Sequence, residues 1–195
     1  LLRRLARHHE VFCYDLRGER TFGPGPLGAS RTPHVEIGWH AADLAGLIER
    51  LRLERPSVLG VSFGGAIALE LAVEHPWAID SLVIHGMESR FRATTAAGIV
   101  RHVLERYALP TNSPFINQFL NMLYARKPEP GPQLDQVVER IWRTPQTVMA
   151  ARLEELEQFD ATDRLWRVDV PTLVLAGARD VIVPASRQKR LAMEI

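Results

Sequence analysis

Residues 58–76 read VLGVSFGGAIALELAVEHP and carry the clearest structural pattern in the sequence. It opens with an apolar run, Val58–Val61, that shows no polar alternation, which is typical of a strand covered on both faces. The next segment, Gly64–His75, is apolar almost all round and is stopped by Pro76, so it predicts a helix deep inside a domain. A buried strand, a tight turn and a buried helix therefore follow one another directly.

The same alternation extends to either side of this stretch. Three more short apolar runs, Val11–Tyr14, Ser81–His85 and Thr172–Ala176, predict further buried strands. A helical stretch from Glu36 to Leu53 precedes residues 58–76 and has apolar residues at three- and four-residue steps. Strands that alternate with helices form parallel sheets with right-handed crossovers. We therefore predict an α/β fold with a mostly parallel, doubly wound sheet.

Between residues 88 and 160 the strand signals disappear and helical patterns follow one another. Asn112-Ser113-Pro114 and Thr144-Pro145 each place a capping side chain before a proline, which indicates helix starts. An all-helical insert of this kind is typically a cap over the carboxyl edge of the sheet, where ligands bind. We expect three parts: a first core part at 1–87, a helical cap at 88–160 and a second core part at 161–195.

The turn Gly60-Val61-Ser62-Phe63-Gly64, called the elbow below, has the pattern G-x-S-x-G. A tight strand-to-helix turn leaves the serine exposed above the sheet, so Ser62 is a candidate nucleophile. The backbone N–H of Phe63, at the N-terminus of the predicted helix, is a natural donor to a developing oxyanion. The alternative is that the glycines serve close packing and Ser62 only caps the helix.

With these features the sequence resembles the α/β-hydrolase superfamily over nearly its whole length. Residues 14–18 (YDLRG) are similar to the family's D-x-R-G turn, and residues 58–76 to its strand, elbow and central helix. Residues 170–184 (VPTLVLAGARDVIVP) resemble the strand and loop that carry the family's triad acid, which falls on Asp180. The resemblance implies a serine esterase or lipase-like enzyme with a Ser-Asp-His triad and with no metal or organic cofactor.

Position along the chain supports Asp180 independently. It follows the predicted strand Thr172–Ala176 on the edge where Ser62 also emerges, so the two side chains can meet across one crevice. A carboxylate there would orient a histidine and stabilise its charged form. Two alternatives remain: Asp180 caps the loop before a helix opened by Pro184, or the acid is Glu88, where some relatives of this fold carry it.

The histidine of the expected triad is missing from the sequence. Seven histidines are present, and none of them follows Asp180: His8, His9, His34, His40, His75, His85 and His102. His85 is the only one expected near the active edge, either as a catalytic group or as a packed residue at a strand end. The resemblance puts the catalytic histidine beyond Ile195 and the first oxyanion donor before Leu1.

The chain starts without Met inside one helical pattern and ends inside another, so we expect a fold truncated at both ends. Loss of the triad histidine costs on the order of a million-fold in rate, so these residues alone should be nearly inactive.

Composition excludes several other classes of protein. Lys and Arg number 24 against 23 Asp and Glu, for a net charge of +1, and no basic stripe marks a nucleic-acid partner. The single cysteine, Cys13, cannot form an intramolecular disulfide, and no apolar run is long enough to span a membrane, so we expect a cytoplasmic protein. The G-x-G-x-x-G at residues 23–28 contains two prolines that remove backbone donors, which favours a surface loop over a dinucleotide site.

The sequence thus supports three functional hypotheses. The first is a serine hydrolase acting on an ester, thioester or similar acyl substrate. The second is a non-catalytic relative that binds a small apolar ligand, and the third is acyl transfer or C–C bond hydrolysis on the same machinery. Apolar residues of the insert either line an acyl pocket or, as we expect for most, form the insert's own core: Phe115, Phe119, Met122, Tyr124, Trp142 and Met149.

Overall fold

The computed structural model describes residues 2–16, 36–92, 95–107 and 144–195, together with residues 114, 118, 131–132, 135 and 139. Its helices and strands run in the order α1 (Leu2–Leu5), α2 (Ile37–Arg50), β1 (Ser57–Val61), α3 (Phe63–Glu74), β2 (Ser81–His85), α4 (Thr95–Arg106), α7 (Gln146–Gln158), β3 (Thr172–Leu175) and α8 (Ala185–Glu194). Two short 3-10 turns, η1 (Pro76–Ala78) and η2 (Thr162–Arg167), complete the described elements.

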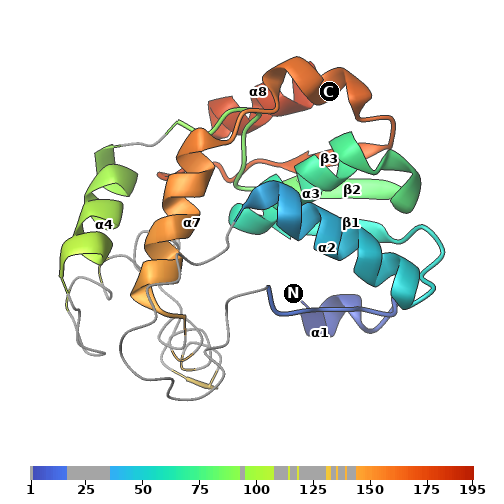
Figure 1. The fold of residues 1–195 in the computed structure, drawn as a ribbon, viewed down its shortest axis with the longest axis horizontal. Coiled ribbons are helices and arrows are strands. Elements are labelled where there is room, and N and C mark those ends of the chain that lie inside the picture. The colour runs from blue at the N-terminus through green and yellow to red at the C-terminus, as the bar shows by residue number, and fades with distance from the viewer. Residues whose placement is uncertain are drawn as a thin grey trace.

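In the described part of the chain the strands form one parallel sheet in the order β1-β2-β3. The register places Gly60 opposite Ile84, and Ile84 opposite Val174. The crossover from β1 to β2 runs through α3, and α2 packs against α3 (Figure 1). The predicted α/β fold with a parallel sheet is therefore confirmed, and the bounds of α2, α3 and the three strands lie within a few residues of those expected.

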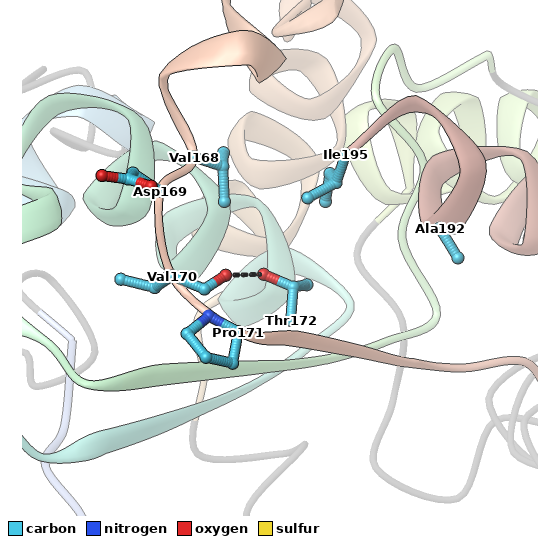
Figure 2. Close-up of a pocket in the computed structure, with 7 residues that line it drawn as sticks. All are labelled: Val168, Asp169, Val170, Pro171, Thr172, Ala192 and Ile195. Carbon is cyan, nitrogen blue, oxygen red and sulfur yellow. Dashed lines mark hydrogen bonds between the residues drawn. The ribbon is translucent and has the colours of Figure 1, made fainter.

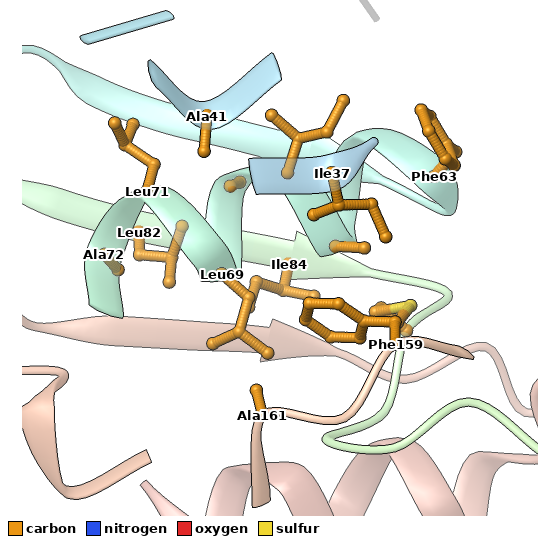
Figure 3. Packing of buried hydrophobic residues seen from close by; sticks show 14 of the residues in the cluster. Ile37, Ala41, Phe63, Leu69, Leu71, Ala72, Leu82, Ile84, Phe159 and Ala161 are labelled. Atoms are coloured by element: carbon orange, nitrogen blue, oxygen red, sulfur yellow. The ribbon is translucent and has the colours of Figure 1, made fainter. Parts of the chain in front are cut away.

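Helix α3 lies at the centre of the core because nearly every side chain on it is apolar. Leu69, Leu71 and Ala72 are fully buried on this helix, and α2 covers it with Ile37 and Ala41. Figure 3 shows these side chains packed beside Leu82 and Ile84 of β2. A helix buried all round can sit only between two other layers, here the sheet and α2.

The expectation that each strand is covered on both faces is wrong for the described residues. Leu59, Val61, Leu173 and Leu175 are 38%, 49%, 55% and 44% exposed, although Gly60 and the β2 residues Leu82 and Ile84 are buried. Neighbouring side chains of a strand point to opposite faces, so the described helices cover one face of the sheet. An apolar run permits burial of a strand on both faces. Whether other elements actually cover both faces depends on the tertiary structure.

The predicted strand at Val11–Tyr14 is also wrong. The structure assigns no strand to residues 11–16, and Phe12 and Tyr14 are 53% and 40% exposed. A strand needs a neighbour to accept and donate its backbone hydrogen bonds, and none of the three described strands pairs with this segment. The rest of the D-x-R-G motif, and residues 23–28, lie outside the described residues.

Helices α4 and α7 pack against each other to one side of the sheet (Figure 1). They share a small core of Val100, Leu104 and Ala150, with Met149 and Leu153 against it. Helix α7 starts within one residue of the predicted position, but its N-cap is Pro145, without a side-chain capping bond, rather than Thr144. Met149 therefore packs against the core that α4 and α7 share. The other apolar candidates between residues 88 and 160, and Asn112-Ser113, lie outside the described residues.

An ion-pair group joins η2 to α3. Both terminal nitrogens of Arg164 contact Glu70, at 2.7 and 2.9 Å, and one of them also contacts Glu74 at 3.1 Å. The hydrogen bond to Glu70 raises the pKa of Arg164 above its ordinary value. This group anchors the chain that leads into β3.

Of the helices described, none is long and apolar enough to cross a membrane.

Candidate active site

Ser62 lies at the elbow between β1 and α3 in a conformation that side-chain-bearing residues rarely adopt. Its φ is +53° and its ψ is −121°. The Ser62 N–H donates to the carbonyl oxygen of His85 at 2.9 Å, and the Ser62 carbonyl oxygen accepts from Gly65 N–H and Ala66 N–H at 2.7 and 3.1 Å. Hydrogen bonds from β2 and from the first turn of α3 thus hold a strained backbone in place.

The Ser62 side chain makes no capping hydrogen bond to the helix that follows, and the residue is exposed. The alternative in which Ser62 serves as a side-chain cap is therefore wrong. An exposed hydroxyl on a strained turn is available for chemistry instead.

Gly60 allows the strand and the helix to approach closely. A Cβ on Gly60 would lie 2.7 Å from the Cβ of Ala68 and 2.8 Å from the Cα of Gly65, and it would also overlap the carbonyl oxygen of Gly64. Gly64 itself has open space around it. The two glycines of the motif therefore play different parts, and only Gly60 is required by packing.

Phe63 connects the elbow to the helical insert. Its ring meets the imidazole of His40 edge-on at 5.9 Å between centroids, and the guanidinium carbon of Arg152 lies 5.4 Å from its centroid. Arg152 comes from α7, so one helix of the insert reaches the elbow. The Phe63 backbone N–H stands at the N-terminus of α3, where the helix dipole favours negative charge.

Asp180 lies in the loop after β3 and is held by three N–H donors. Its Oδ1 accepts from the backbone N–H groups of Ile182 and Val183, both at 2.9 Å, and its Oδ2 accepts from Gln188 Nε2 at 2.9 Å. The loop-capping role considered for Asp180 is therefore real, and Oδ1 performs it. The other carboxylate oxygen, Oδ2, takes no part in this loop and bonds to Gln188 instead.

The structure brings Ser62 and Asp180 together around Gly86. This glycine has φ +67°, and a Cβ built on it would lie 3.8 Å from both the Oδ2 of Asp180 and the backbone N of Ser62. The two residues therefore flank one backbone position at the carboxyl ends of β1, β2 and β3. Both residues therefore lie at the edge of the sheet where the sequence predicts them.

The two alternative site residues have other contacts. The Nδ1 of His85 is 2.7 Å from the carbonyl oxygen of Leu175, so this ring bridges β2 and β3. Glu88 is 8% exposed, and its Oε1 accepts from the Arg92 N–H at 3.1 Å and from Arg187 at 3.2 Å. Both contacts fit structural roles. Within the described ranges, no three His, Cys, Asp or Glu side chains gather as metal ligands would.

Gln188 is the residue of the site that the sequence reasoning missed. It is fully buried on α8, although its neighbours Arg187, Lys189 and Arg190 give the segment a polar look. The spacing of the sequence could have indicated this burial, because Gln188 lies three residues before the buried Leu191 and so on the same helix face. A buried polar residue needs hydrogen-bond partners, and Gln188 finds them in Asp180, Val183 and Gly86.

A pocket, shown in Figure 2, lies away from these residues. Val168–Thr172 line it together with Ala192 and Ile195, and the Thr172 hydroxyl donates to the Val170 carbonyl oxygen at 3.0 Å. It therefore sits where β3 begins, whereas Ser62 and Asp180 lie where the strands end. It is not part of the candidate site.

The chain resembles known proteins along most of its length. A protein of Agrobacterium fabrum provisionally named as the carbamate hydrolase RutD is 28% identical over 200 residues, which cover 96% of this chain and 71% of that protein. A pimeloyl-[acyl-carrier protein] methyl ester esterase of Neisseria meningitidis is 31% identical over 134 residues, which cover 65% of this chain and 52% of the esterase.

The fold is also found among solved structures. The crystal structure of a hydrolase from Pseudomonas aeruginosa matches this chain with a TM-score of 0.78 and 24% identity. The match covers all of this chain and 71% of the hydrolase chain. The family described as alpha/beta hydrolase fold matches residues 1–192. The chain, with its parallel sheet and its elbow at Ser62, therefore belongs to the α/β hydrolase fold family.

Proposed function

We propose that the protein is a serine hydrolase that acts on an ester or a similar small acyl substrate. The observation that carries this proposal is the strained, exposed Ser62 with Asp180 across Gly86 from it. The names of the relatives, a carbamate hydrolase and a methyl ester esterase, support a hydrolase role. A carboxylesterase-like reaction fits a serine nucleophile without a metal or an organic cofactor.

In this mechanism the Ser62 hydroxyl attacks the acyl carbonyl carbon while a histidine base takes its proton. The oxyanion that forms lies at the N-terminus of α3, where Phe63 N–H donates to it. The tetrahedral intermediate collapses, and the leaving alcohol takes the proton from the histidine. Water then attacks the acyl-serine ester by the same steps and restores Ser62. Asp180 orients the histidine and stabilises its charged form.

We propose that the base is a histidine that residues 1–195 do not include. None of the seven histidines follows Asp180 in the sequence, and His85 has its Nδ1 on the Leu175 carbonyl oxygen. A second oxyanion donor is also assigned outside these residues. The 195 residues on their own are then nearly inactive, because the oxyanion donor and the acid cannot replace the base.

Residues 88–160 act in this proposal as the cap of the site, between core parts at 1–87 and 161–195. The contact of Arg152 with the Phe63 ring supports this arrangement, because it sets α7 beside the elbow. The partner is a small acyl compound rather than nucleic acid, in keeping with the net charge of +1. The exposed, free Cys13 fits a reducing, cytoplasmic location.

The proposal is tested with a fluorophosphonate probe on the full-length protein. The probe should label Ser62, and Ser62→Ala should abolish both labelling and turnover of 4-nitrophenyl acetate. Asp180→Asn should lower kcat by about 10⁴-fold, as loss of a triad acid does. Ser57→Ala is the matched control, because Ser57 lies at the other end of β1 and bonds to Ser81 at 2.7 Å.

Labelling at a different residue would overturn the assignment of Ser62. The absence of any labelling would instead favour the non-catalytic, ligand-binding hypothesis. Labelling of Ser62 with acyl transfer to an added alcohol in preference to water would move the reaction to the acyltransferase class.

A further inference from the structure

We infer that Gln188 is a positioning residue that fixes the Asp180 carboxylate relative to Ser62. This inference rests on the proposed function, since it assigns a part in the same site. It concerns a side chain on α8 that would not itself touch the substrate.

Both polar atoms of the Gln188 side-chain amide, the nitrogen and the oxygen, have hydrogen-bond partners. Its Nε2 donates to the Oδ2 of Asp180 at 2.9 Å and to the carbonyl oxygen of Val183 at 2.6 Å, and its Oε1 accepts from Gly86 N–H at 3.0 Å. The side chain is fully buried. An exchange of oxygen and nitrogen would set the amide oxygen against a carboxylate and the NH₂ group against an N–H, so the contacts define the amide orientation.

These bonds determine how the carboxylate of Asp180 is turned. Its Oδ1 already receives two backbone N–H groups from its own loop. Gln188 provides the donor to Oδ2 that comes from outside the loop, and one lone pair of Oδ2 remains for a histidine. Without Gln188, the oxygen that faces the base would lose its fixed direction.

The same side chain connects the acid loop with the nucleophile. Gly86 follows His85, and the carbonyl oxygen of His85 accepts the Ser62 N–H at 2.9 Å. Through Gly86, Gln188 therefore holds the turn that supports the elbow, while through Nε2 it holds Asp180. One buried amide thus sets the distance between nucleophile and acid, and misplacement of such groups by 1 Å can cost about 10²-fold in rate.

The test compares substitutions of Gln188 in the full-length protein. Gln188→Met keeps the size of the side chain and removes all three hydrogen bonds. Gln188→Glu keeps an acceptor for Gly86 but sets a carboxylate against Asp180. Lys189→Met is the matched control, because Lys189 is the exposed neighbour on the same helix. Active sites are counted by fluorophosphonate titration of Ser62, so that unfolded protein does not enter kcat.

We expect Gln188→Met to lower kcat per active site by about 10- to 100-fold, with KM changed less than about twofold. Gln188→Glu should lose more, because like charges then face each other, and Lys189→Met should match the wild type. A purely structural role would reduce the number of active sites and leave kcat per site unchanged. That result, in either Gln188 variant that folds, would overturn the inference.

A wild-type measurement keeps the inference testable if both variants fail to fold. The Gly86 amide proton should exchange slowly with solvent, because it is bonded to a buried side chain. Fast exchange at Gly86 would refute the bridge. If Asp180→Asn leaves the protein fully active, the proposed function and this inference are both refuted. If Asp180→Asn loses activity but Gln188→Met does not, only the inference is refuted.

Discussion

Gly60→Ala should destabilise the protein far more than a single added methyl group usually does. The new Cβ would lie 2.7 Å from the Ala68 Cβ and 2.8 Å from the Gly65 Cα. Carbon atoms in contact stand about 3.5–4.0 Å apart, so β1 and α3 would have to separate by about 1 Å. The obstructing atoms belong to the backbone and a Cβ, which have no rotamer to change. Overpacking costs about 1–3 kcal/mol and occasionally more, and we expect about 3 kcal/mol here.

The matched control is Gly64→Ala, at the other glycine of the same motif. A Cβ there meets nothing within 4 Å, and Gly64 lies inside α3. Replacement of a helical glycine by alanine is favourable by about 0.5–1 kcal/mol. The two glycines of one motif should therefore give effects of opposite sign.

The assay is urea unfolding followed by far-ultraviolet circular dichroism, together with thermal melting of the full-length protein. For a domain of this size, a loss of about 3 kcal/mol corresponds to a melting temperature about 6–12 °C lower. A Gly60→Ala protein within about 1 kcal/mol of the wild type would show that strand and helix can separate freely. In that case the close approach at the elbow would not be what makes this glycine necessary.

Other residues give further expectations. Glu70→Gln should lower the free energy of unfolding by about 1–2 kcal/mol, because the Glu70 side chain is only 11% exposed where it pairs with Arg164. Glu74→Gln should lower it by less than about 1 kcal/mol, because Glu74 is 37% exposed; equal values in urea unfolding would contradict this ranking. Hydrogen bonds from Thr162 lower the pKa of Asp160 below its ordinary 3.8, so its stabilising effect is complete above about pH 4 and is lost as the pH falls through the folded-state pKa. The melting temperatures of wild type and Asp160→Asn should therefore differ at pH 7, and the difference should shrink as the pH falls below about 4; a constant difference would refute this. His85→Gln should keep kcat within about tenfold, because its ring is bonded to a strand carbonyl; a loss of about 10³-fold or more would make His85 a catalytic group.

Much of the fold could be predicted because its signals are local. The apolar run of Ser81–His85 became β2, and the uniformly apolar segment after Ser62 became α3, because strand and helix preferences depend on residues a few positions apart. The elbow was visible for the same reason. Its glycines and serine all lie within five consecutive residues.

Local signals failed where a segment depends on what lies beside it. Val11–Tyr14 has the composition of a strand, yet the structure assigns it none, since a strand requires a neighbour for its hydrogen bonds. Gln188 looked like one more polar residue of an exposed helix, and its partner Gly86 is 102 positions away. Contacts across such a separation leave no pattern in a short window of sequence.

The alternation of strands and helices, the turn that carries Ser62 and the loop that carries Asp180 can all be read from local sequence patterns. Which face of the sheet is covered, and that Ser62 and Asp180 flank Gly86, became known only from the folded chain. The folded chain also shows that Gln188 is buried against the acid. The physical reason is that backbone preferences are set by near neighbours along the chain. The position of one side chain against another is set by the register of strands and the packing of helices that lie far apart in sequence.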